Sequence, residues 1–81
     1  MAGKSRKLVR VDLLALPAFR RLSFHQQQEI VLRARRIDAG QEQPLADFSR
    51  GTYVFLLAGG TVVYMKALPD IIVIEHIIER K

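Results

Sequence analysis

Four side chains in the second half of the chain, Tyr53, Tyr64, Lys66 and His76, have the chemical types that acid–base catalysis requires. Cleavage of RNA at a 2′-hydroxyl needs a general base, a cation for the phosphate charge and a proton donor for the leaving oxygen. Lys66 can supply the charge, while His76 or Tyr64 can act as the base or the acid. In the alternative interpretation these are ordinary strand side chains, with buried tyrosine rings, hydroxyl groups in water and His76 at the rim.

These side chains lie on a segment, residues 52–78, whose composition predicts β-strands. Three runs rich in Val, Ile, Tyr and Phe are separated by a Gly59-Gly60 pair and a Pro69-Asp70 pair, which are turn signals. β-Branched and aromatic residues favour a pleated, half-buried surface over a helix. The segment therefore predicts a three-stranded antiparallel meander.

The two turns decide which side chains share a face of this meander. A two-residue turn at the glycine pair places Tyr53 opposite Lys66. A three-residue loop over residues 68–70 places Lys66 opposite Ile72 and brings His76 to the face that Tyr53 and Lys66 share. A two-residue turn there would instead put the glutamate before His76 on that face, because a one-residue slip exchanges the faces. The sequence leaves this choice open.

The first forty residues predict a strand and two helices. Residues 8–14 alternate like a strand with one face in water, although a short helix that begins near Asp12 is an alternative. Pro17 favours the first turn of a helix over residues 17–22. A longer helix is expected over residues 24–38.

The longer helix has recognisable ends and one apolar stripe. Ser23 and Gln26 fit a capping box, and Gly40 lies where a C-cap glycine belongs. The stripe expected to pack on the sheet comprises Phe24, Ile30, Val31, Ala34 and Ile37. Together the elements predict an α+β fold, in which residues 1–7 are a flexible basic tail and residues 8–81 form one domain. Both helices should cover one face of an antiparallel sheet.

Positive charge is concentrated before residue 38. The net charge is +5, yet residues 1–37 hold nine Lys or Arg against two acidic residues, whereas residues 38–81 hold four against six. A basic half predicts a polyanionic partner, either nucleic acid or an acidic protein segment, and the alternative is simply a soluble basic surface. Because guanidinium binds phosphate bidentately, the expected contacts are Arg20, Arg21, Arg33, Arg35, Arg36 and Arg50.

The composition argues against several classes of site. With 81 residues and a hydrophobic fraction of 49%, the chain is long enough for a single core and too apolar for disorder. It has no cysteine and two histidines, so we expect neither a disulfide nor a structural zinc site. No phosphate loop or dinucleotide fingerprint is present, and no cofactor is expected. With no apolar run near the roughly 20 residues of a membrane-spanning helix and no signal-peptide pattern, a cytoplasmic location is expected.

Residues 60–66 and 69–76 are similar to the last two strands of the RelE/ParE superfamily of bacterial toxins. The Tyr53-Val54-Phe55 run also resembles a strand of ParE-type members. Their closing strand carries a similar set of residues, here His76, Glu79 and Arg80. The resemblance implies a growth inhibitor that cuts messenger RNA without a metal or inhibits DNA gyrase, and that a partner protein (an antitoxin) neutralises. For an RNA-cleaving member, the expected catalytic residues are Tyr64, Lys66, His76 and Arg80.

Two further observations widen the range of functions. Ribonuclease members often carry an arginine where this chain has Val62, which favours a gyrase inhibitor or a non-catalytic relative. Residues 13–23, 39–40 and 53–56 are similar to the opening of cyclic-nucleotide-binding domains, but the phosphate-binding cassette of that family is missing, so no nucleotide site is expected. The alternative function is a small non-enzymatic binding module that inhibits or adapts a larger protein or nucleic-acid complex. Its strand edges would pair with a partner or with a second copy in a homodimer.

Overall fold

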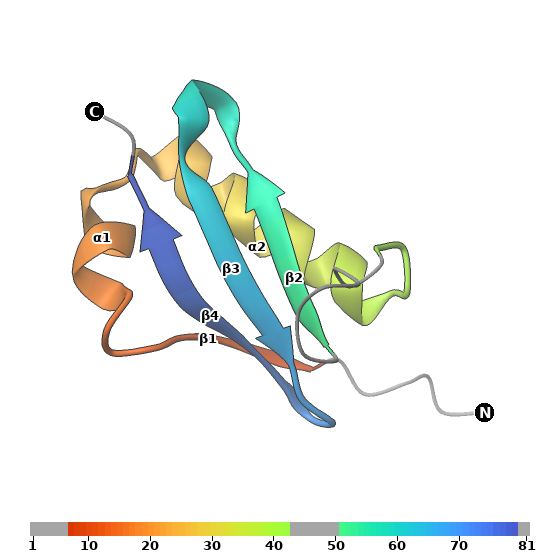
Figure 1. The fold of residues 1–81 in the computed structure, drawn as a ribbon. Coiled ribbons are helices and arrows are strands. Elements are labelled where there is room, and N and C mark those ends of the chain that lie inside the picture. Colours follow the sequence, from red (N-terminus) through yellow and green to blue (C-terminus); the bar gives the residue numbers. More distant parts are fainter. Residues whose placement is uncertain (1–6, 43–50, 80–81) are drawn as a thin grey trace.

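A computed structural model describes residues 7–42 and 51–79, which form two helices and a four-stranded sheet. Strand β1 (Leu8–Val11) is followed by helices α1 (Leu16–Arg21) and α2 (Phe24–Asp38), then by strands β2 (Thr52–Leu56), β3 (Val62–Ala67) and β4 (Ile71–Ile78). In Figure 1, α2 crosses behind the sheet and α1 lies beside β4. The predicted α+β class is confirmed. The predicted tail lies outside the described residues apart from its last position.

The sheet is mixed rather than antiparallel. Its strand order is β1-β4-β3-β2, in which β2, β3 and β4 pair antiparallel and β1 runs parallel to β4. The expectation of an antiparallel sheet is therefore wrong, and the strand order is not that of a simple meander. A parallel pair requires a long connection. Here the chain between β1 and β4 supplies it, since it includes both helices and two strands.

Helix α2 begins and ends where the sequence predicts. The Ser23 hydroxyl accepts the backbone N–H of Gln26 at 3.1 Å, and the side chain of Gln26 accepts the backbone N–H of Ser23 at 3.3 Å. At the other end Gly40 has a φ of +75°, and the N–H of Gln41 donates to the carbonyl of Arg36 at 2.8 Å. These bonds are the capping box and the Schellman-type end, and they satisfy backbone groups that would otherwise have no partner.

The first strand is shorter than predicted. It ends at Val11, and the next N–H, of Asp12, still donates to the sheet at Ile74 with a distance of 2.9 Å. The chain then turns, because the N–H of Ala15 donates back to the carbonyl of Asp12 at 2.9 Å. Leu13, which the alternation places inside the strand, is consequently 80% exposed.

The core lies between α2 and the sheet. Its largest fully buried side chains are Ile30, Val63, Met65, Ile72 and Ile74. The expectation that Phe24 and Val31 pack in this core is wrong, since they are 73% and 39% exposed. Successive residues of a helix differ by about 100° in direction, so a helix that buries Ile30 turns Val31 toward its flank.

Candidate functional site

No described helix lies over the face of the sheet opposite α1 and α2, although two of its residues, Thr52 and Val73, are only 5% and 9% exposed. Because side chains alternate along each strand, the residues on this face are those whose sequence neighbours pack in the core. Three of its apolar residues, Leu8, Leu56 and Ile78, are 71%, 67% and 54% exposed. We call this surface the open face; it consists of Leu8, Arg10, Thr52, Val54, Leu56, Val62, Tyr64, Lys66, Ile71, Val73, His76 and Ile78.

Tyr64, Lys66 and His76 lie together at the centre of the open face. Tyr64 on β3 is the cross-strand neighbour of His76 on β4; the ring centroids are 6.2 Å apart and the ring planes are 88° apart. This edge-to-face arrangement is favourable for aromatic rings. Lys66 follows Tyr64 by two residues along β3, so it points to the same side of the sheet. Three of the four side chains that the three-residue-loop alternative places on one face therefore share it.

The turn between β3 and β4 is the shorter of the two alternatives. The N–H of Leu68 donates to the carbonyl of Ile71 at 2.8 Å, which leaves the Pro69-Asp70 pair as the turn. Lys66 is therefore opposite Val73, and the alternative that pairs it with Ile72 is wrong. Continued without interruption, this register would place Glu75 beside Tyr64, because a one-residue slip exchanges the faces.

A β-bulge in β4 brings His76 to the open face instead. Met65 is opposite Ile74 and Tyr64 is opposite His76, so Glu75 has no partner in the ladder. A bulge inserts one extra residue into one strand and re-aims the side chains that follow it. The position of His76 therefore depends on two local features that compensate each other, the short turn and the bulge.

Tyr53 lies on the opposite face, so its predicted place beside Lys66 is wrong. Its side chain packs against the core, with its ring stacked on Phe55 at a centroid distance of 6.4 Å and an interplanar angle of 13°. The cause is the connection between β2 and β3, which runs from Leu57 to Thr61 and is closed by a bond of 2.8 Å between the N–H of Leu57 and the carbonyl of Thr61. This loop is longer than the expected two-residue turn.

The predicted arginines of α1 and α2 lie on the helical layer, and the structure does not bring them to Tyr64, Lys66 and His76. Arg21 forms an ion pair of 2.7 Å with Glu79. Arg33 and Arg36 lie 3.5 Å and 3.0 Å from the same carboxylate oxygen of Glu42. These three arginines therefore connect the helices to neighbouring segments, and their binding of polyanions stays a prediction.

The remaining predicted arginines have different positions. Arg20 is exposed on α1, and the guanidinium of Arg35 donates to the backbone carbonyl of Lys7 at 2.9 Å, which links α2 to the start of β1. Arg50 and Arg80 lie outside the described residues. Their predicted roles in binding and catalysis stay predictions.

Arg10 is a residue of the open face that the sequence analysis missed. The parallel pairing of β1 with β4 places Arg10 opposite Val73, which is itself opposite Lys66. The alternation in residues 8–11 indicated which side chains share the face of Arg10. It could not indicate the neighbouring strand, because pairing between distant segments is not encoded in a local pattern.

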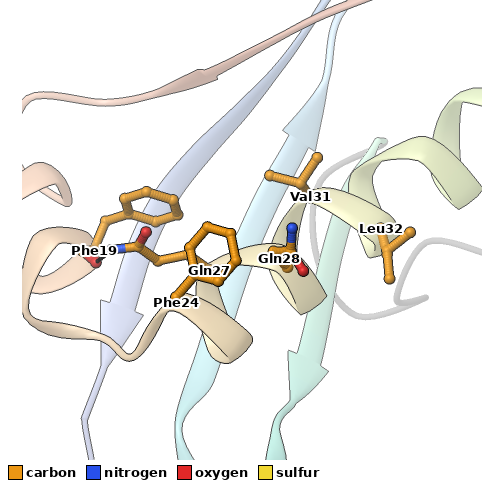
Figure 2. A pocket seen from close by; sticks show the side chains of 6 residues that line it. All are labelled: Phe19, Phe24, Gln27, Gln28, Val31 and Leu32. Carbon is orange, nitrogen blue, oxygen red and sulfur yellow. Dashed lines mark hydrogen bonds between the residues drawn. The ribbon is translucent and has the colours of Figure 1, made fainter.

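A separate hollow of about 360 Å³ lies on the outer side of the helices. Figure 2 shows its lining, which consists of Phe19, Phe24, Gln27, Gln28, Val31 and Leu32. The Gln27 amide donates to the carbonyl of Phe19 at 2.8 Å and so joins α1 to α2. Because all six lining side chains are apolar or neutral amides, the hollow offers no group for acid–base chemistry.

Other classes of site receive no support within residues 7–42 and 51–79. This part of the chain has no group of three or more residues that could hold a metal ion, and none of its helices is long and apolar enough to cross a membrane. No protein-family model, curated protein or solved structure matches the chain. The resemblance to the RelE/ParE superfamily stays a prediction from the sequence.

Proposed function

We propose that this protein is a toxin-like inhibitor of bacterial growth that acts through the open face. The observation that supports the proposal is the position of Tyr64, Lys66 and His76 together at the centre of a sheet face over which no described helix lies. An antiparallel pairing of strands is stable with one face packed and the other in water, so an open face is available to a target. The resemblance to the RelE/ParE superfamily agrees with this use.

If the target is messenger RNA, the three side chains supply the groups that cleavage needs. One of Tyr64 and His76 takes the proton from a 2′-hydroxyl as its oxygen attacks the adjacent phosphorus, and the bond to the 5′-oxygen breaks. The other donates a proton to that leaving oxygen, which leaves a cyclic phosphate. The ammonium group of Lys66 balances the charge that develops on the phosphate oxygens. No metal is required in this scheme.

If the target is DNA gyrase, the same face binds without cleaving. The protein would act in the cytoplasm, and a partner protein that covers the open face or the basic helices would neutralise it. Either target predicts that growth stops when the protein is produced without such a partner.

The second candidate function is a non-enzymatic binding module, and one observation favours it. Leu56, Val62 and Ile78 are cross-strand neighbours at one end of the open face, and Leu56 and Ile78 are 67% and 54% exposed. Contiguous exposed apolar side chains are typical of surfaces that bind another protein. In this function the apolar row, defined as these three residues, anchors a larger partner.

Induced expression in growing bacteria, with pulse-labelling of protein and DNA synthesis, tests the proposal. An early fall in protein synthesis would identify messenger RNA or the ribosome as the target. An early fall in DNA synthesis alone would identify gyrase or the replication machinery. Normal rates of both, with continued growth, would refute growth inhibition.

Matched variants separate the two functions. Lys66→Ala or His76→Ala should abolish activity of an enzyme while its fold and partner affinity persist, whereas in a binding module each change only weakens association. Leu56→Asp should remove binding through the apolar row. Leu32→Asp is the control, since Leu32 is 64% exposed, close to the 67% of Leu56, but lies on the helical side. Full activity of both the Lys66 and His76 variants would refute catalysis.

A further inference from the structure

Two cations and two aromatic rings occupy neighbouring rows of the open face. Arg10 and Lys66 lie in one row on either side of Val73, and Tyr64 and His76 lie in the next row. Neighbouring strands are about 4.8 Å apart, so the backbones of the two cations are separated by about 10 Å. Side chains on one face recur about every 7 Å along a strand, which is the spacing between the two rows.

The positive charge of this row is not neutralised within the described part of the chain. Neither Arg10 nor Lys66 forms an ion pair there, in contrast to the arginines of the helical layer. Glu75, the bulged residue that precedes His76, has no ion pair with either cation. Unpaired positive charge on an exposed face attracts an anionic ligand.

The aromatic pair lies on the two central strands of the four-stranded sheet, β3 and β4. Sheets that bind RNA use aromatic side chains at such positions to stack unpaired bases, while neighbouring cations contact the backbone. The rings are 88° apart in plane, so they can stack on bases in different orientations. A duplex keeps its bases stacked within the helix, so only an unpaired strand can use these rings.

We propose that the open face binds single-stranded RNA, with Arg10 and Lys66 on its phosphates and Tyr64 and His76 stacked against its bases. This inference rests on the proposed function in its use of the open face, and it selects RNA rather than gyrase as the ligand. It also gives Arg10 a role in holding the strand that is separate from proton transfer.

Fluorescence anisotropy with a labelled, non-self-complementary RNA of about 12 nucleotides tests the aromatic part of the inference; this length lies within the range that small nucleic-acid-binding folds cover. Tyr64→Leu and His76→Leu should each weaken binding by about 5-fold to 100-fold, as expected for the loss of one stacked base. The matched control is Phe24→Leu, because Phe24 is an exposed aromatic residue on the helical side. This control should bind as the wild type does.

The dependence of the affinity on salt tests the cationic row. Each phosphate contact to a single strand adds about 0.7 to the slope of log K against log salt concentration. Arg10→Gln and Lys66→Gln should each lower this slope by about 0.7, whereas Lys66→Arg, which retains the charge, should preserve it. A slope unaffected by both glutamine variants would overturn the assignment of these residues.

Three further results would overturn the inference: no binding of the RNA, equal competition by a duplex RNA, or unaltered affinity in the Tyr64 variant. The outcome is distinguishable from that of the growth experiment. Growth arrest without RNA binding would remove this inference and leave the proposed function in place. RNA binding without growth arrest would support the RNA-binding face and refute growth inhibition.

Discussion

Deletion of Glu75 should leave the fold intact, although it removes a residue from a central strand. Glu75 is the unpaired residue of the bulge, between the Met65–Ile74 and Tyr64–His76 pairs. After the deletion these pairs follow each other directly and form a regular ladder. The rest of β4 keeps its partners and its faces, so His76 stays beside Tyr64.

The free energy of unfolding should then change by about 1 kcal/mol or less. No buried apolar side chain is lost, and the gain or loss of one hydrogen bond contributes about 0.5–1.5 kcal/mol. Deletion of Val73 is the matched control. Without Val73, the next residue of β4 pairs with Lys66, so Ile74, which is 0% exposed, moves to the open face. Glu75 then lies opposite Met65 in the core.

The control should therefore fail to fold. Loss of one buried isoleucine costs about 2–5 kcal/mol, and burial of an unpaired carboxylate adds to this. A small domain has a free energy of unfolding of about 5–15 kcal/mol, so these two losses together approach or exceed the whole of it. Urea denaturation followed by circular dichroism gives both values, and a nuclear Overhauser contact between Tyr64 and His76 reports the register. Equal loss of stability in the two deletion variants would refute the bulge.

Three other predictions concern stability, and each can be measured from the urea midpoint. Ile30→Ala should cost about 2–5 kcal/mol, whereas Val31→Ala should cost less than about 1 kcal/mol because its side chain is partly in water; similar losses would contradict the placement of these neighbours. Gly51→Ala should cost about 1–3 kcal/mol, since the glycine has a φ of +79° and an added Cβ would lie 2.8 Å from the carbonyl oxygen of Ala67; an unchanged midpoint would rule out this strain. Ser23→Ala should cost about 1 kcal/mol through loss of the helix cap, and Ser23→Thr, the control, should lose much less.

The sequence predicted the features that short segments determine. The caps of α2 were predictable because Ser23, Gln26 and Gly40 act on backbone groups within one turn of the helix. The buried side of that helix was predicted only in part. Apolar residues occupy a wide arc of α2, and periodicity alone does not show that Ile30 is buried while Phe24 is exposed.

The arrangement of the sheet depended on contacts that a local pattern does not contain. Tyr53 was assigned to the wrong face because the loop after Leu57 is longer than its glycine pair indicates. The sequence left open whether His76 or Glu75 shares the face of Tyr64, because a three-residue loop favours the first and a two-residue turn the second. The structure has the two-residue turn, yet a bulge brings His76 to that face. Arg10 was missed because its neighbour in the sheet, Val73, is far away in the sequence.

The order of the strands also bears on how the protein is made. Strand β4 is the last strand to leave the ribosome, but it lies between β1 and β3 in the sheet. Until β4 emerges, β1 has no strand to pair with and one edge of β3 has free backbone groups. Such unpaired strand edges are sites at which chains aggregate and for which chaperones are needed. A nascent chain that stops before residue 71 therefore lacks both a complete sheet and the histidine of the open face. The open face is therefore complete only after the segment up to Ile78 has been translated.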